Sequence, residues 1–260
     1  MKWVLSFSGG KDSTALLHII LREKLPLDEV IIYDSGWEFP ELNEHIKLVE
    51  RKTGIVIKRI SANPDWWDLL RKWGWPSMRC RWCTGEKGKA LDKATIGCGK
   101  YIGLAFDEKS RVSKYPNRDV VRFPLVDYHI TQQAAMMMCI KEGYTWNGLY
   151  DIFPRFSCFC CPLQTWKTLH KLAQYKPNLW QRILEAHSLL PDELRSRGFK
   201  DTRQPWWSEQ SIEMKESNRA RSRRFRISKK NDLSWRINER MRQRESKRRN
   251  RLYRLQVDQT

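Results

Sequence analysis

The sequence predicts an α/β fold in which a twisted parallel sheet carries helices on both faces, followed by a basic C-terminal tail that is helical or disordered. In the first 60 residues, three apolar runs of strand length alternate with two stretches of helical periodicity. Such strand–helix–strand units form right-handed crossovers between parallel strands. Hydrophobic residues make up 40% and charged residues 30% of the 260 residues, which is typical of a globular chain that buries a core.

Each early element has its own signal. The apolar run that begins the chain ends at two glycines, and helical spacing of apolar residues follows it. Pro40 suits the first turn of the second helix, and Gly54 is its stop signal. The expected order is a strand over Lys2–Ser8, a helix over Asp12–Glu23, a strand over Glu29–Tyr33, a helix from Pro40 to Thr53 and a strand over Ile55–Ile60.

Later elements have weaker signals. We expect a strand over Lys100–Leu104 and a helix that begins after Thr131 as N-cap and ends near Glu142. Two further helices are expected near Gln164–Tyr175 and Asn178–Ser188. The composition shifts after residue 205, which predicts two parts, a domain over 1–205 and a basic tail over 206–260.

Charge is concentrated in the tail. Of the net charge of +19, residues 211–260 contribute +11, from 17 Lys/Arg and 6 Asp/Glu. This excess favours nucleic acid as a partner, before a membrane surface, because neutralising phosphates releases condensed counterions. The alternative is a tail that only improves solubility.

The chain predicts a cytoplasmic protein without a membrane span. No apolar run approaches the roughly 20 residues that cross a bilayer, and the first strand reaches glycine too soon for a signal peptide. In the cytoplasm, seven cysteines are expected to be reduced, metal-bound or redox-active rather than paired in disulfides.

The glycine turn after the first strand predicts an anion site. A helix that starts there directs unpaired N–H groups and its positive dipole end to the carboxyl edge of the sheet. Glycine lets the anion approach the backbone, Lys11 adds charge, and hydroxyl groups add donors. The turn lacks the spacing of a Walker A loop and of a GxGxxG fingerprint. The expected site is formed by Ser8, Gly9, Gly10, Lys11, Asp12, Ser13 and Thr14.

Ser-Gly-Gly-Lys-Asp-Ser, residues 8–13, resembles the pyrophosphate loop of the adenine nucleotide α-hydrolase, or PP-loop, superfamily. Asp34-Ser35-Gly36 with Phe39-Pro40-Glu41 resembles the DTG and FPE segment of its phosphoadenylylsulfate (PAPS) reductase family. The resemblance implies a Rossmann-like HUP fold that binds ATP, or adenylylsulfate (APS) or PAPS, with Mg²⁺. It implies catalytic roles for Lys11, Asp12 and Asp34, and adds Asp34, Gly36 and Gly103 to the nucleotide site.

Further segments extend the resemblance over about residues 1–190. Gly103-Leu104-Ala105-Phe106-Asp107-Glu108 is similar to the glycine-led strand of the family, and Phe123-Pro124-Leu125-Val126-Asp127 to a segment that leads into a helix. Ala105 and Phe106 replace the usual arginines, which places recognition of an extra phosphate or sulfate in question.

Two CxxC pairs predict a four-thiolate site. Cys80 and Cys83 form one pair, Cys158 and Cys161 the other, and each spacing lets both sulfurs point the same way. Zinc and iron–sulfur clusters both suit four thiolates. The segments resemble those of family branches with a [4Fe–4S] cluster, such as the sulfurtransferases of DNA phosphorothioation, so a [4Fe–4S] cluster is expected and Zn²⁺ is the alternative. Cys98 and Cys139 are interpreted as buried apolar residues.

Three functions are compatible with these motifs. The preferred one is an enzyme that activates its substrate with ATP and transfers sulfur, possibly to nucleic acid, with a sulfur-donor protein as a possible partner. The second is a reductase of APS or PAPS, although no cysteine follows Cys161 to attack sulfate as in classical PAPS reductases. The third is a nucleic-acid-binding subunit that the nucleotide only switches.

Overall fold

A computed structural model describes residues 1–195 except 62–64, 78–79, 116–118, 157 and 162. The chain divides after Thr202 into two units, and all described residues belong to the first. The predicted domain boundary at 205 and the basic tail lie outside the described residues.

Five parallel strands form one sheet in the order β3-β2-β1-β4-β5. Along the chain, β2 and β3 are added on one side of β1, and β4 and β5 on the other, so the strand order reverses between β1 and β4. The predicted parallel α/β fold is confirmed. The strands are β1 (Trp3–Phe7), β2 (Glu29–Asp34), β3 (Ile57–Ser61), β4 (Gly99–Ile102) and β5 (Val121–Arg122).

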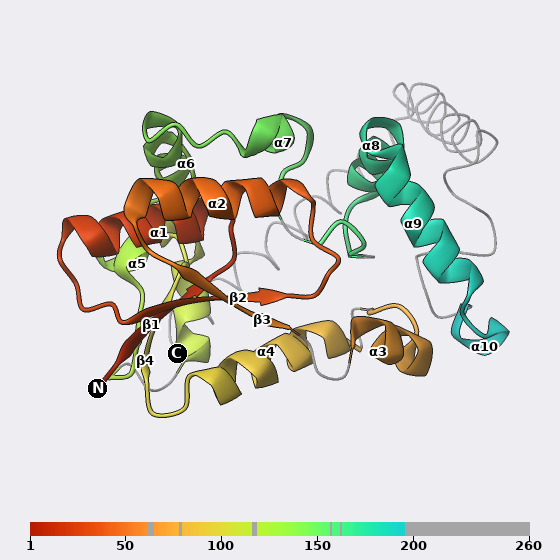
Figure 1. Cartoon of the computed structure of the whole chain (residues 1–260), viewed down its shortest axis with the longest axis horizontal. Helices are drawn as coiled ribbons and strands as arrows, with labels where there is room; N and C mark the ends of the chain where they lie inside the picture. Colours follow the sequence, from red (N-terminus) through yellow and green to blue (C-terminus); the bar gives the residue numbers. More distant parts are fainter. Residues whose placement is uncertain (62–64, 78–79, 116–118, 157, 162, 196–260) are drawn as a thin grey trace, which may run out of the picture. The chain divides into compact units, whose positions relative to one another are not determined.

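Helices cover both faces of this sheet (Figure 1). The first helix packs on β1 and contacts the two helices that follow β5, while α4 contacts β2 and β3 from the opposite face. The helices are α1 (Lys11–Arg22), α2 (Glu41–Thr53), α3 (Trp66–Trp73), α4 (Trp82–Ala94), α5 (Pro124–Asp127), α6 (Gln132–Lys141), α7 (Leu149–Ile152), α8 (Trp166–Tyr175), α9 (Pro177–Ser188) and α10 (Asp192–Arg195), with 3₁₀ turns η1 (Phe106–Lys114) and η2 (Trp146–Gly148).

The predicted end signals are found where helices begin and stop. The Thr131 hydroxyl accepts the N–H of Ala134 at 3.2 Å, which makes it the N-cap of α6. Gly54 ends α2 in the left-handed conformation at φ +69°. Some elements were not predicted. The clearest case is α4, which has no buried residue and therefore little apolar periodicity.

Aromatic rings form a second core beside the sheet. Trp37 is 1% exposed, and its ring lies 4.7 Å from that of Trp66, 6.3 Å from that of Trp75 and 5.5 Å from that of Phe159. Trp66 and Trp75 are buried as well, so these tryptophans pack the core. Within the described part of the chain, no helix is long and apolar enough to cross a membrane.

Candidate nucleotide and cysteine sites

The glycine loop comprises residues 8–10 and the first turn of α1 up to Thr14. It lies at the point where the strand order reverses. It joins β1 to α1, and Gly103 follows β4 directly, so both predicted segments lie at the carboxyl edge where open α/β sheets bind ligands. A Cβ at Gly103 would lie 3.2 Å from the amide nitrogen of Ser13. A side chain there would crowd the first turn of α1, so glycine allows the two segments to meet.

Serine hydroxyls close the loop on itself. Oγ of Ser13 accepts the N–H of Ser8 at 3.2 Å, lies 3.0 Å from Oγ of Ser8 and donates to the carbonyl oxygen of Gly10 at 3.0 Å. Ser13 is 3% exposed, whereas Ser8 is exposed to solvent. Hydrogen bonds within the loop therefore fix its conformation, and the exposed Ser8 is accessible to a ligand.

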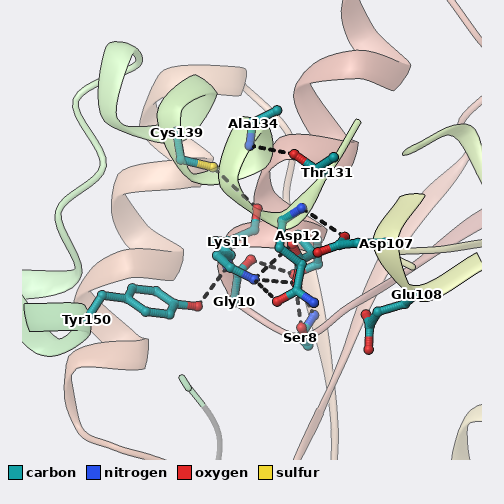
Figure 2. Close-up of polar contacts among 12 residues, drawn as sticks. Ser8, Gly10, Lys11, Asp12, Asp107, Glu108, Thr131, Ala134, Cys139 and Tyr150 are labelled. Atoms are coloured by element: carbon teal, nitrogen blue, oxygen red, sulfur yellow. Dashed lines mark hydrogen bonds and ion pairs between the residues drawn. The ribbon is translucent and has the colours of Figure 1, made fainter. Parts of the chain in front are cut away.

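The charged residues of the loop bind one another. Nζ of Lys11 lies 2.9 Å from Oδ2 of Asp12 and donates to Oε1 of Gln132 at 3.1 Å. Burial raises the pKa of Asp12 against the lowering effect of Lys11, and the nearby Glu108 and Asp107 raise it further. In Figure 2, Asp107 and Glu108 lie on one side of Lys11 and Tyr150 on the other. The site thus holds carboxylates beside a half-buried ammonium, a suitable setting for Mg²⁺ bound to phosphates.

Three side chains from residues 139–150 hold the loop backbone, and sequence reasoning missed all of them. The indole N–H of Trp146 donates to the carbonyl oxygen of Gly9 at 2.8 Å. Oη of Tyr150 accepts the N–H of Lys11 at 2.9 Å, and Sγ of Cys139 donates to the Lys11 carbonyl oxygen at 3.3 Å (Figure 2). Cys139, predicted to be a buried apolar residue, is buried and also touches the loop. No local sequence motif indicates these contacts, because they join residues more than 120 positions apart.

His45 supports the loop from the core. Its Nε2 lies 2.9 Å from Oγ1 of Thr14, and its ring stacks on Trp146 with centroids 4.8 Å apart. Burial lowers the pKa of His45 to about 4, so the ring is neutral near pH 7. Thr14 is 0% exposed and its hydroxyl is hydrogen-bonded to His45. In this conformation Thr14 therefore stabilises the fold and is not accessible to a ligand.

The loop after β2 lies beside the glycine loop and is folded around two carboxylates. Asp34 accepts the N–H of Gly36 at 2.9 Å and pairs with Arg59 at 3.0 Å. Glu38 accepts the N–H and hydroxyl of Ser35 and the N–H of Trp37, at 3.1, 2.8 and 3.2 Å. A polar cavity of about 350 Å³ opens beside this loop and is lined by Asp34, Ser35, Gly36, Arg59, Ser61 and Asp65.

The carboxylate of Glu38 also contacts the second cysteine pair. Sγ of Cys158 donates to Oε1 of Glu38 at 3.7 Å, and the two residues form an isolated antiparallel bridge. Desolvation by burial raises the pKa of Cys158 to about 12, with Glu38 as the next cause. The β2 loop and the cysteine segment are therefore bonded to each other.

Cysteines of both predicted pairs approach one another. Burial raises the pKa of the Cys83 thiol, and Cys161 adds to that rise, while Cys161 also contributes to the raised pKa of Cys158. Cys160 is buried, and burial raises its thiol pKa well above the usual value. Cys80 is exposed, at the turn before α4. Cys98, predicted to be buried, is half-buried.

Cysteine thiols are suitable ligands for a zinc ion or an iron–sulfur cluster. Among the described residues, no three His, Cys, Asp or Glu side chains are placed to hold one metal ion. Thiolates of a [4Fe–4S] cluster bind different irons, so such ligands need not converge on one point as zinc ligands do. The thiols therefore suit either group by their chemistry.

The sequence model of the phosphoadenosine phosphosulfate reductase domain matches residues 2–105. This match covers less than half of the chain. This segment contains the glycine loop, the β2 loop and the strand that leads to Gly103, while the second cysteine pair and residues 139–150 follow it.

Two relatives of the chain are uncharacterized proteins of Methanocaldococcus jannaschii. One is 27% identical over 194 residues, covering 69% of this chain and 40% of the relative. The other is 28% identical over 229 residues, covering 81% of this chain and 53% of the relative. The chain thus spans about half the length of these relatives.

Solved structures of low identity also resemble the chain. The U34-tRNA thiolase NcsA of Methanococcus maripaludis, with its [4Fe–4S] cluster, is 15% identical with a TM-score of 0.40, covering 73% of this chain and 71% of that one. The NH₃-dependent NAD synthetase of Campylobacter jejuni is 11% identical with a TM-score of 0.40, covering 75% and 81%. The strand order, rather than these similarities, establishes the parallel α/β fold of this chain.

Proposed function

We propose that the protein is an adenylating PP-loop enzyme. It binds ATP with Mg²⁺ and transfers AMP to an oxygen of a nucleic acid, with release of pyrophosphate. Sulfide-level sulfur from a donor protein then bonds to the activated carbon, and AMP leaves with the oxygen. One observation carries the proposal: the loop beside the glycine loop is hydrogen-bonded through Glu38 to Cys158. Activation and sulfur chemistry would then share one edge of the sheet.

The chain's own residues have defined tasks in this reaction. The N–H groups at the start of α1, with Lys11, stabilise the departing pyrophosphate. Asp12 supplies a carboxylate for Mg²⁺, which usually takes one or two carboxylates beside substrate phosphates. Asp34, at the end of β2, would bind the nucleoside, and its carboxylate pairs with Arg59 at 3.0 Å.

The cysteines would hold the sulfur-handling group. The proposed ligands of a [4Fe–4S] cluster are Cys80, Cys83, Cys158 and Cys161, and zinc is the alternative metal. When bound, a cluster would supply iron that binds sulfur. Glu38 orients Cys158, and the rings of Trp37 and Phe159 exclude water behind the cysteine segment.

Two measurements test the proposal. The protein is purified without oxygen, and iron, acid-labile sulfide and zinc are measured per chain. Radiolabelled ATP is then incubated with the protein and nucleic acid, and AMP and pyrophosphate are counted. About four irons with matching sulfide, and AMP formed only with nucleic acid present, support the proposal. An Asp12→Asn variant should form no AMP. Wild-type protein that never forms AMP would favour a nucleotide-switched binding subunit instead.

A second candidate is reduction of APS or PAPS, which the family match over residues 2–105 favours. It needs no nucleic acid but needs a dithiol that supplies two electrons, and it predicts release of sulfite and the adenine nucleotide from the adenylylated sulfate. Sulfite release without AMP formation from ATP would establish this candidate and reject the first.

Binding of nucleic acid is proposed for the basic tail. Deleting residues 206–260 should flatten the dependence of nucleic-acid affinity on salt, because the slope counts neutralised phosphates. Pyrophosphate binding by the truncated protein is the control for an intact nucleotide site. An unchanged slope would remove the tail from the proposed interface.

A further inference from the structure

Gly10 is only half-buried, so an open position lies over it, bordered by two hydroxyl groups and the carbonyl oxygen of Phe156. A Cβ at Gly10 would lie 3.3 Å from Oη of Tyr150 and 3.6 Å from Oγ of Ser8. Gly10 has φ −79° and ψ 168°, a conformation that any residue adopts, so the backbone does not require glycine there. What glycine preserves at this position is the space between the two hydroxyls.

The hydroxyl of Tyr150 is prepared to donate a hydrogen bond. Its oxygen accepts the N–H of Lys11 at 2.9 Å, so its own proton is directed to another group. Burial raises the pKa of Tyr150 above its usual value, so the hydroxyl keeps its proton near neutral pH. Because Lys11 is the first residue of α1, the tyrosine also extends the positive end of the helix toward the open position.

We propose that Tyr150 is an anion-binding residue of the glycine loop. An oxygen of a pyrophosphate or of the terminal phosphates of a nucleotide lies over Gly10, farther from its Cα than a Cβ would lie, and accepts hydrogen bonds from Tyr150 and Ser8. The inference rests on the nucleotide-binding part of the proposed function and is independent of sulfur transfer and of nucleic acid. It adds a residue outside the matched family segment to the phosphate site.

Two variants and one matched control test it. Tyr150→Phe removes the donor and keeps the ring, whereas Gly10→Ala fills the open position without backbone strain. Tyr144→Phe is the control, because the Tyr144 hydroxyl is bonded to Nε2 of His18 at 2.9 Å and is no neighbour of the Gly10 position. Affinities for inorganic pyrophosphate and for AMP are measured by titration calorimetry, and thermal unfolding checks that each variant is folded.

Both variants should bind pyrophosphate at least tenfold more weakly than wild type, while their affinity for AMP changes less than twofold. A residue that only supports the fold would weaken both ligands alike. The double variant should bind no more weakly than the weaker single variant, because both changes remove the same contact. The control should bind pyrophosphate as wild type does.

Three outcomes would overturn the inference. The first is unchanged pyrophosphate affinity in folded Tyr150→Phe. The second is tighter binding in that variant, which would mean that the tyrosine competes with the anion. The third is a wild-type protein that binds no pyrophosphate. Wild-type-like binding by Gly10→Ala would equally reject the assigned position. A protein that passes this test and never transfers sulfur refutes only the proposed reaction.

Discussion

The indole N–H of Trp146 and the carbonyl oxygen of Gly9 are joined by a buried hydrogen bond of 2.8 Å. Gly9 has φ +74°, a conformation that favours glycine, and a Cβ there would lie 2.2 Å from Cδ1 of Leu42. The peptide that turns the chain toward the open position over Gly10 is thus held by a side chain 137 residues away. The shape of the anion site depends on this long-range contact.

Replacing Trp146 should therefore affect both stability and ligand binding. Trp146→Phe keeps a ring but leaves the buried Gly9 carbonyl without its donor, which should lower the free energy of unfolding by about 1–3 kcal/mol. Nucleotide affinity should fall several-fold, because the loop loses its fixed peptide orientation. Urea unfolding and calorimetric titration measure the two effects. Trp73→Phe is the control, since that side chain is 50% exposed. Equal effects of both substitutions would contradict the assigned role.

His45 predicts a pH dependence of stability. Its pKa is about 4 in the folded protein and about 6.5 when exposed, so below pH 6.5 the unfolded chain binds the extra proton. Its contribution is present above pH 6.5 and is lost as the pH falls toward 4, by roughly 3 kcal/mol between pH 8 and pH 4. Urea unfolding across this range measures it. His45→Gln should unfold with a weaker pH dependence, and an unchanged one would disprove this origin.

Glu38 should link the β2 loop to the cysteines. Four groups donate to its carboxylate, and Glu38→Gln replaces one of the two accepting oxygens by an NH₂ donor. The free energy of unfolding should fall by about 2 kcal/mol, and metal content should fall as well. Glu44→Gln, on the exposed surface of α2, is the matched control. A stable Glu38→Gln variant with full metal content would show that the link carries neither role.

Metal content should distinguish the cysteines from one another. Serine at position 83, 158 or 161 should abolish bound metal, because these thiols approach one another. The predicted four-thiolate site requires the same loss for Cys80→Ser, whereas Cys98→Ser should retain metal. Iron, sulfide and zinc are measured per chain after anaerobic purification. Full metal content in Cys80→Ser would reduce the ligand set to three cysteines.

Local signals in the sequence predicted the sheet and the longer helices. The alternation of apolar runs placed β1, β2 and β3, and Gly54 and Thr131 marked helix ends because capping depends on residues nearby. Exposed or short elements such as α4 and β5 were missed, since they bury too little apolar surface to impose a period.

The candidate site was predictable only in part. The glycine loop is a contiguous motif, so its residues could be named from the sequence. Its partners Trp146, Tyr150 and Cys139 could not, because they reach the loop only after α6 packs on α1 and η2 packs on α2. The contact of Glu38 with Cys158 likewise depends on a bridge between segments 120 residues apart.

The support of the glycine loop by residues 139–150 limits how the domain can be recombined. A chimera that joins residues 1–105 to another protein that contains this domain would carry the whole recognisable motif, yet Gly9 would lose its indole donor and Lys11 its phenol acceptor. A crossover after residue 152 keeps the loop and its supports together. The smallest exchangeable unit of this fold is therefore about half as long again as the segment that family resemblance marks out.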